Sequence, residues 1–153
     1  MALVDDQDYE LVMQYSWTIA EQQRKNRPGQ ARTYATSSPK SFGFRSVLMH
    51  QVITGWPQTD HCDGDGLNNQ RSNLREATGT QNNANRHKQA SPATSQYKGV
   101  HWNGRKWEAR IKDGPRQRRL GYFTSEEDAA RAYDSAAIAA WGEYALLNFR
   151  KGK

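Results

Sequence analysis

The sequence predicts an α+β protein built from two small domains, and three observations support this prediction. A length of 153 residues fits one ordinary domain or two small ones. The first half alternates short β-prone and helical segments around a turn-rich centre, whereas the last third has three strand-like runs and then one helical run. Residues 89–95 between them are small and polar and contain proline, which is typical of a linker. We therefore expect domains at residues 1–88 and 96–150.

The composition excludes membrane-spanning and disulfide-rich classes. No apolar run is long enough to cross a bilayer and no secretory leader is recognisable, so we expect an intracellular protein that does not bind membranes. Cys62 is the only cysteine, which excludes an intramolecular disulfide and a cysteine-rich zinc site. We expect Cys62 to pack in the fold rather than to take part in chemistry.

The positive charge is concentrated in one stretch. The chain carries a formal net charge of +6, and between Arg86 and Tyr122 ten Lys and Arg residues stand against only Glu108 and Asp113. This stretch alone therefore carries +8, and the rest of the chain is slightly acidic. Basic residues interleaved with Trp and Tyr on strand-like runs favour a polyanionic partner, and nucleic acid is our first choice.

The N-terminal segments predict a small β scaffold. Residues 3–19 read as a short acidic helix followed by a strand, and residues 20–30 read as a polar loop with proline and glycine. Residues 32–36 and 42–45 are rich in aromatic and small residues and read as strands. We expect these strands to lead into the turn-rich centre.

Residues 46–54 predict a short helix. Ser46 is a suitable N-cap and Gly55 a suitable terminator, and the apolar residues between them recur close to helical spacing. For His50 we favour a hydrogen-bonding role that holds this helix to the following turn over a catalytic role.

The turn-rich centre predicts a hairpin over residues 59–78 and a helix over residues 79–87. Asp60 and His61 would stand at the end of the first strand. A histidine near neutral pKa can accept a proton from water, and a divalent cation held by carboxylate and amide oxygens can stabilise a leaving oxyanion. These residue types therefore suit phosphodiester hydrolysis.

Two other interpretations of the turn were weighed. An EF-hand with Gly66 in its glycine position would begin at His61 and end at Ser72, which cannot supply the bidentate carboxylate, so we reject a calcium loop. Alternatively, the Asp, Gly and Asn residues of this turn simply bend the chain and cap one another.

The pattern Asp-His-x-Asp-Gly-x-Gly-x-Asn-Asn-x-x-x-Asn-Leu-Arg resembles the HNH (His-Asn-His, ββα-metal) endonucleases of the phage and homing type over residues 48–87. The resemblance implies a ββα-metal nuclease module behind the N-terminal β scaffold. By that resemblance His61 is the general base, Asn73 orients it, and Asp60 and Asn82 are metal ligands.

One departure from the HNH pattern concerns the last ligand. The archetypal motif ends in a second histidine, where this chain has Asn82, and a shift in register would make Asn83 or Asn85 the ligand. An amide oxygen and a carboxylate suit a hard cation, so the expected cofactor is one divalent cation, Mg²⁺ or Mn²⁺.

The C-terminal segment predicts a three-stranded antiparallel sheet packed on one α-helix. Strand-like runs at residues 97–102, 106–112 and 118–123 are separated by Asn-Gly and Asp-Gly-Pro turn signals. Period-two alternation places Trp107, Ala109 and Ile111 on one face and Glu108, Arg110 and Lys112 on the other. Residues 124–141 read as an alanine-rich helix with Thr124 and Glu127 as a capping box, ended by Gly142.

Residues 97–149 resemble the DNA-binding domain of the plant Apetala/ethylene-responsive transcription factors, through Tyr-x-Gly-Val, Lys-Trp-x-Ala-x-Ile, Leu-Gly-x-Phe and the closing Leu-Asn-Phe. The resemblance implies that the sheet enters the major groove of double-stranded DNA. The positions that match the contacts of that family are Lys98, His101, Arg105, Trp107, Arg110, Lys112 and Arg119. The plant pattern has Arg at positions 98 and 101 and Trp at position 119, so the plant target sequence does not carry over.

Together these features favour a homing-type DNA endonuclease that cuts duplex DNA with one divalent cation in the host-cell cytoplasm of a phage or bacterium. A monomer would nick the duplex, and a homodimer would break both strands. The alternative is a non-enzymatic, sequence-specific DNA-binding regulator that carries a decayed nuclease module. A third interpretation, an RNA-binding structural protein, fits the charge but leaves the Asp-His and Asn set unexplained.

Overall fold

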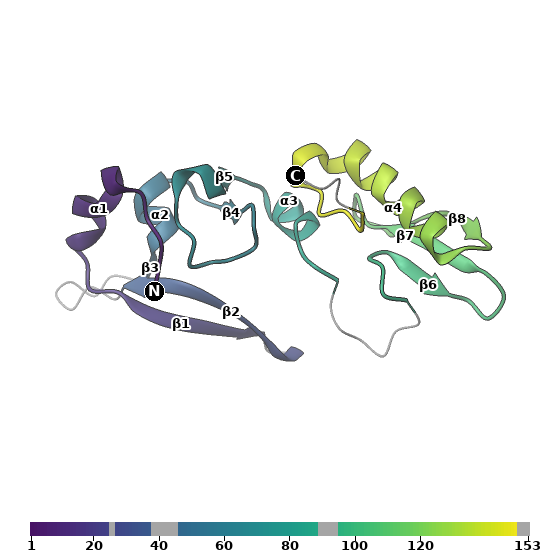
Figure 1. The fold of residues 1–153 in the computed structure, drawn as a ribbon, viewed down its shortest axis with the longest axis horizontal. Helices are drawn as coiled ribbons and strands as arrows, with labels where there is room; N and C mark the ends of the chain where they lie inside the picture. Colours follow the sequence, from purple (N-terminus) through teal and green to yellow (C-terminus); the bar gives the residue numbers. More distant parts are fainter. Residues whose placement is uncertain (25–26, 38–45, 89–94, 150–153) are drawn as a thin grey trace. The chain divides into compact units, whose positions relative to one another are not determined.

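The computed structural model describes residues 1–24, 27–37, 46–88 and 95–149 and divides the chain into two compact units, residues 1–78 and 79–153 (Figure 1). Both units combine helices with antiparallel sheets, which confirms the α+β class. The strand predicted at residues 42–45 and most of the linker at 89–95 lie outside the described residues. The functional domains at 1–88 and 96–150 stay a prediction.

Unit 1 begins with α1 (Asp6–Met13) and an antiparallel sheet of β1 (Thr18–Arg24), β2 (Arg27–Ser37) and β3 (Val47–Leu48). The prediction of a loop at residues 20–30 is wrong over most of this range. β1 and β2 pair from Thr18 with Thr36 to Arg24 with Arg27, so the backbone ladder continues through the polar stretch where the apolar pattern fades.

The helix predicted at 46–54 is shorter in the structure. Val47 and Leu48 pair with β2, and α2 (Met49–Thr54) starts after them. Ser46 does not cap this helix, because its hydroxyl bonds to the Thr36 side chain on β2. Gly55 ends α2 with a left-handed φ of 71°, as predicted.

The core of unit 1 lies where α1 packs on α2 and α2 packs on the sheet, and it contains Val12, Ala35, Met49, Ile53 and Leu74. β4 (Thr59–His61) and β5 (Leu74–Glu76) form an antiparallel pair, joined by a long turn that ends in the short 3₁₀ helix η1 (Arg71–Asn73). Arg71 fixes this turn to α1, because Nε and Nη2 donate to the buried Asp8 carboxylate at 2.8 and 2.7 Å.

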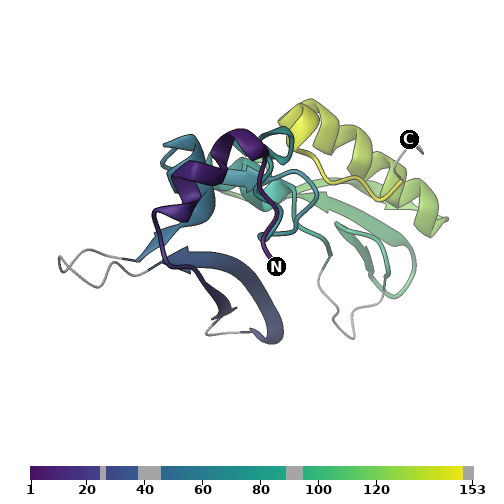
Figure 2. The ribbon, with the colours of Figure 1, turned by 60° about the vertical axis from the view of Figure 1, so that its left-hand side comes forward.

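Unit 2 contains the predicted sheet and helix. β6 (Val100–Trp102), β7 (Trp107–Ile111) and β8 (Arg118–Phe123) form an antiparallel sheet, and α4 (Glu126–Trp141) lies along one face of it (Figure 2). Small residues of α4, among them Ala129, Ala130 and Ala137, are almost fully buried in the core. The N-cap is Ser125 rather than Thr124, and its hydroxyl accepts from the Asp128 amide at 3.3 Å.

The segment after η2 (Gly142–Tyr144) is fastened to the start of the sheet. Asn148 accepts from the Lys98 amide at 2.6 Å and donates to the Lys98 carbonyl at 3.2 Å. The buried Asp134 of α4 accepts from the amides of Asn148 and Phe149 at 2.8 and 2.9 Å. Gly99 follows at φ 77°, beneath the Tyr133 ring.

The predicted helix at 79–87 is found as α3 (Gly79–Ala84), but it belongs to unit 2. The carbonyl of Ala84, at its C-terminal end, accepts from the Leu146 amide at 3.2 Å and from the Lys98 ammonium. These bonds attach α3 to the C-terminal segment, whereas β4 and β5 belong to unit 1. The ββα-metal arrangement predicted for these three elements is therefore not shown.

Candidate nucleic-acid interface

The sheet of unit 2 has one face covered by α4 and one outer face. Ala109 and Ile111 of β7 point into the core, so alternation turns Glu108 and Arg110 to the outer face. Pairing across the strands places His101 and Tyr122 on either side of Glu108. The centre of the outer face is thus a row of polar and aromatic residues.

A single buried carboxylate holds two arginines on this face. Glu108 is only 2% exposed, and its two oxygens accept from Arg110 Nη2 at 2.6 Å and from Arg119 Nε at 2.7 Å. The arginine side chains themselves remain 40% and 57% exposed. The Arg110 hydrogen bond, followed by that of Arg119, lowers the pKa of Glu108, so this carboxylate stays ionised.

Aromatic side chains flank the arginines. The Arg119 guanidinium lies 5.1 Å from the centre of the Tyr122 ring, and Tyr122 is 47% exposed. Trp102 of β6 is also exposed, but it pairs with Trp107, and their rings lie 5.0 Å apart on the side of the sheet that carries Ala109. Sequence reasoning placed Glu108 on this face without giving it a role, and it passed over Tyr122, which strict alternation with the core-packed Leu120 would have turned inward.

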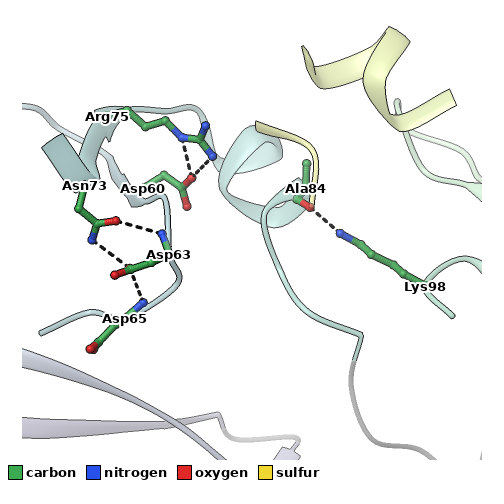
Figure 3. A network of polar contacts seen from close by, with 7 residues as sticks. All are labelled: Asp60, Asp63, Asp65, Asn73, Arg75, Ala84 and Lys98. Carbon is green, nitrogen blue, oxygen red and sulfur yellow. Dashed lines mark hydrogen bonds and ion pairs between the residues drawn. The ribbon is translucent and has the colours of Figure 1, made fainter. Parts of the chain in front are cut away.

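The remaining predicted DNA contacts fall into two groups. His101, Arg105 and Lys112 are exposed in β6, in the β6–β7 turn and directly after β7. Trp107 is half-buried against the core. Lys98 is directed to the Ala84 carbonyl (Figure 3), and burial lowers its pKa to about 8. The structure therefore groups His101, Arg110 and Arg119 on one face and places Lys98 and Trp107 elsewhere.

His61, the histidine predicted to be the general base, is buried in unit 1. Its Nε2 lies 3.3 Å from Oδ1 of Asn69, and its ring is 5.0 Å from that of His50 and 6.0 Å from that of Tyr34. Burial is the main cause that lowers the pKa of His61, and the Asn69 contact opposes it. The amide beside His61 is therefore that of Asn69, a residue that sequence reasoning passed over in favour of Asn73.

Asn73 closes the turn instead (Figure 3). Its Oδ1 accepts from the Asp63 amide at 3.0 Å, and its Nδ2 donates to the Asp63 carboxylate at 2.9 Å. Asp65 contributes a further turn bond, because its amide donates to Asp63 at 2.8 Å. These contacts match the interpretation in which the turn residues cap one another. Cys62, expected to pack, is exposed.

The predicted metal ligands Asp60 and Asn82 belong to different units. Oδ2 of the buried Asp60 accepts from Arg75 Nε at 3.0 Å and Nη2 at 2.7 Å (Figure 3), so this carboxylate already has a cationic partner. Asn82 lies on α3, in unit 2. Among the residues that the structure describes, no group of three or more His, Cys, Asp or Glu side chains is placed to hold a metal ion.

The comparisons find sequence relatives among AP2-like and ethylene-responsive transcription factors. Over 57 residues, 37% of this chain, it is 46% identical to the AP2-like ethylene-responsive transcription factor At1g79700 of Arabidopsis thaliana, covering 18% of that protein. It is 47% identical to the ethylene-responsive transcription factor WRI1 of Arabidopsis thaliana over 64 residues, 39% of this chain and 15% of WRI1.

A rice relative gives the same result. The AP2-like ethylene-responsive transcription factor CRL5 of Oryza sativa is 44% identical over 66 residues, which are 37% of this chain and 10% of CRL5. The chain spans less than a fifth of the length of these relatives. No protein-family profile matches the chain. The similarity to this class of DNA-binding transcription factors is therefore shown for part of the chain.

These findings contradict several expectations. The homing-type endonuclease function is contradicted, because the relatives are named as transcription factors and not as nucleases. The expected Mg²⁺ or Mn²⁺ cofactor is contradicted too, because the relatives are transcription factors and the described residues contain no group of three or more His, Cys, Asp or Glu side chains that could hold a metal ion. A location in the cytoplasm of a phage or bacterial host is contradicted by relatives that are plant proteins.

Within the described ranges, no helix has the length and apolarity needed to cross a membrane.

Proposed function

We propose that this chain is a non-enzymatic, sequence-specific DNA-binding regulator, and that the outer face of β6, β7 and β8 binds double-stranded DNA. The observation that carries the proposal is the pair of arginines, the half-buried Arg110 and the exposed Arg119, fixed side by side on a sheet whose other face is covered by α4. The relatives named as transcription factors support the same conclusion.

The chemistry of this face suits a duplex. The major groove of DNA is ~12 Å wide and admits a sheet as well as a helix. Arginine offers a planar fork of donors that matches phosphate oxygens and the guanine edge, and exposed aromatic rings add contact area beside it. The residues proposed to contact DNA are the half-buried Arg110 and the exposed His101, Arg105, Lys112, Arg119 and Tyr122. The expectation of a monomer or a homodimer stays a prediction.

The test uses two variants with matched chemistry. Arg119 and Arg131 are both exposed, and each guanidinium lies over an aromatic ring, at 5.1 Å from Tyr122 and 4.6 Å from Phe149. Arg119 is on the outer face, whereas Arg131 is on α4. Arg119→Ala and Arg131→Ala therefore remove the same charge from opposite sides of the sheet.

Affinity for a random-sequence duplex would be measured by fluorescence anisotropy between about 50 and 200 mM salt, with a single strand of equal length as the competitor. We expect Arg119→Ala to weaken duplex binding and to make the salt dependence shallower by about one unit of slope. Arg131→Ala should leave both unchanged. Equal effects of the two variants would reject the outer face, and absence of duplex binding by the wild type would reject the function.

A further inference from the structure

We propose that Glu108 is a positioning residue for sequence recognition, because it fixes Arg110 and Arg119 as one rigid pair of forks that reads two guanines in the major groove. This inference rests on the proposed function, since it assumes that the outer face meets DNA. It adds a role for an acidic residue, which would not itself approach a polyanion.

The first argument is geometric. Arg110 and Arg119 are directly paired across β7 and β8, and the Glu108 carboxylate holds both. Arg119 is held through Nε, and a bidentate contact to guanine O6 and N7 needs only its two terminal nitrogens. Arg110 is held through Nη2, and the guanidinium group has five donor hydrogens in all. Both arginines can therefore keep their Glu108 bond while they contact a base.

The second argument is electrostatic. Like charges opposite one another on neighbouring strands destabilise the pairing and push the side chains apart. Glu108 lies beside both guanidinium groups and leaves the group of three with a net charge of +1 rather than +2. Without it, we expect the two arginines to separate and to contact phosphates more freely. Base selection would then fall, while general attraction to DNA would not.

The third argument is burial. Glu108 is 2% exposed although it lies on the outer face, between its cross-strand neighbours His101 and Tyr122 and bonded to both arginines. A buried carboxylate holds its partners with less freedom than an exposed surface pair would. Arginines with fewer accessible rotamers lose less conformational entropy when they bind, which favours one register on the DNA.

The test compares two acid-to-amide variants of the full chain. Glu108→Gln removes the shared carboxylate, and Asp113→Asn removes the partner of Arg118, which lies next to Arg119 in sequence. Both raise the net charge by one. The measured quantity is the ratio of affinities for a duplex selected by the wild type from random sequences and for an unselected duplex of equal length.

We expect Glu108→Gln to reduce this ratio by about tenfold, within the roughly 5- to 150-fold discrimination of one good bidentate contact. Affinity for the unselected duplex should stay the same or rise. Asp113→Asn should keep the wild-type ratio. In the free protein, the Nε–H NMR signal of Arg119 should show slow solvent exchange in the wild type and fast exchange in Glu108→Gln.

An unchanged ratio in Glu108→Gln would overturn the inference while leaving the proposed function intact. A wild type that does not bind duplex DNA would instead overturn the proposed function. If the amide NMR spectrum of Glu108→Gln shows an unfolded unit 2, Glu108→Asp replaces it, because the shorter carboxylate cannot reach both arginines. A full wild-type ratio in Glu108→Asp would also overturn the inference.

Discussion

An alanine at position 99 should destabilise unit 2 more than an alanine at position 104. Gly99 and Gly104 have φ values of 77° and 94°, a region that costs other residues roughly 1–2 kcal/mol. At Gly99 the new Cβ would also lie 2.1 Å from Tyr133 Cδ2 and 2.7 Å from the Arg110 carbonyl oxygen. Such overpacking costs about 1–3 kcal/mol, so Gly99→Ala should lose roughly 2–5 kcal/mol of unfolding free energy.

Gly104→Ala is the matched control, because nothing lies within 4 Å of its added Cβ and only the backbone cost of about 1–2 kcal/mol remains. Urea unfolding of the full chain would be followed by the amide NMR signals of Val100 and Ala109, which report on unit 2 alone. Equal losses in the two variants would show that Tyr133 moves aside without cost, and the reasoning from close approach would be refuted.

Three further predictions concern other sites. Arg110→Ala should weaken duplex binding in a fluorescence titration, and unchanged affinity would remove Arg110 from the interface. Asp134→Asn should lower the stability of unit 2 by about 1–3 kcal/mol, because asparagine keeps only one acceptor oxygen for the amides of Asn148 and Phe149, and hydrogen exchange of the amide that loses its acceptor should accelerate. Burial and the neighbouring His61 lower the pKa of His50 from 6.5 to about 4, so the unfolded chain binds the proton first. Stability of unit 1 should therefore be full above about pH 6.5 and fall between pH 6.5 and 4, as urea midpoints would show.

Local patterns predicted the C-terminal fold well. The alternation in residues 106–112 placed Ala109 and Ile111 in the core and Arg110 on the other face, as found. The burial of Glu108 could not be predicted from the sequence, because it depends on contacts with the neighbouring strand. Its partner Arg119 lies on β8, which pairs with β7 through a register shift beside Ala109. Side-chain alternation predicts which face of the sheet a residue points to, but it does not predict which residue of the neighbouring strand lies beside it.

The turn in unit 1 shows a different limit. A turn rich in Asp, Gly and Asn can bind an ion or simply bend the chain, because the side chains that ligate ions also accept hydrogen bonds from backbone amides. Here Asp63 and Asn73 bond to each other and to the turn backbone, and Asn69 rather than Asn73 lies beside His61. Spacing alone could not decide which asparagine reaches the histidine across the long turn.

The clamp between Lys98 and Asn148 has a consequence for how such a domain is carried in longer proteins. One asparagine side chain holds the residue just before the sheet to the segment that follows α4 and η2. A body whose entry and exit adjoin can be inserted into a host chain without stretching either flank. The matched stretch accounts for only 10% to 18% of the relatives described above, which is the situation that such adjoining ends permit.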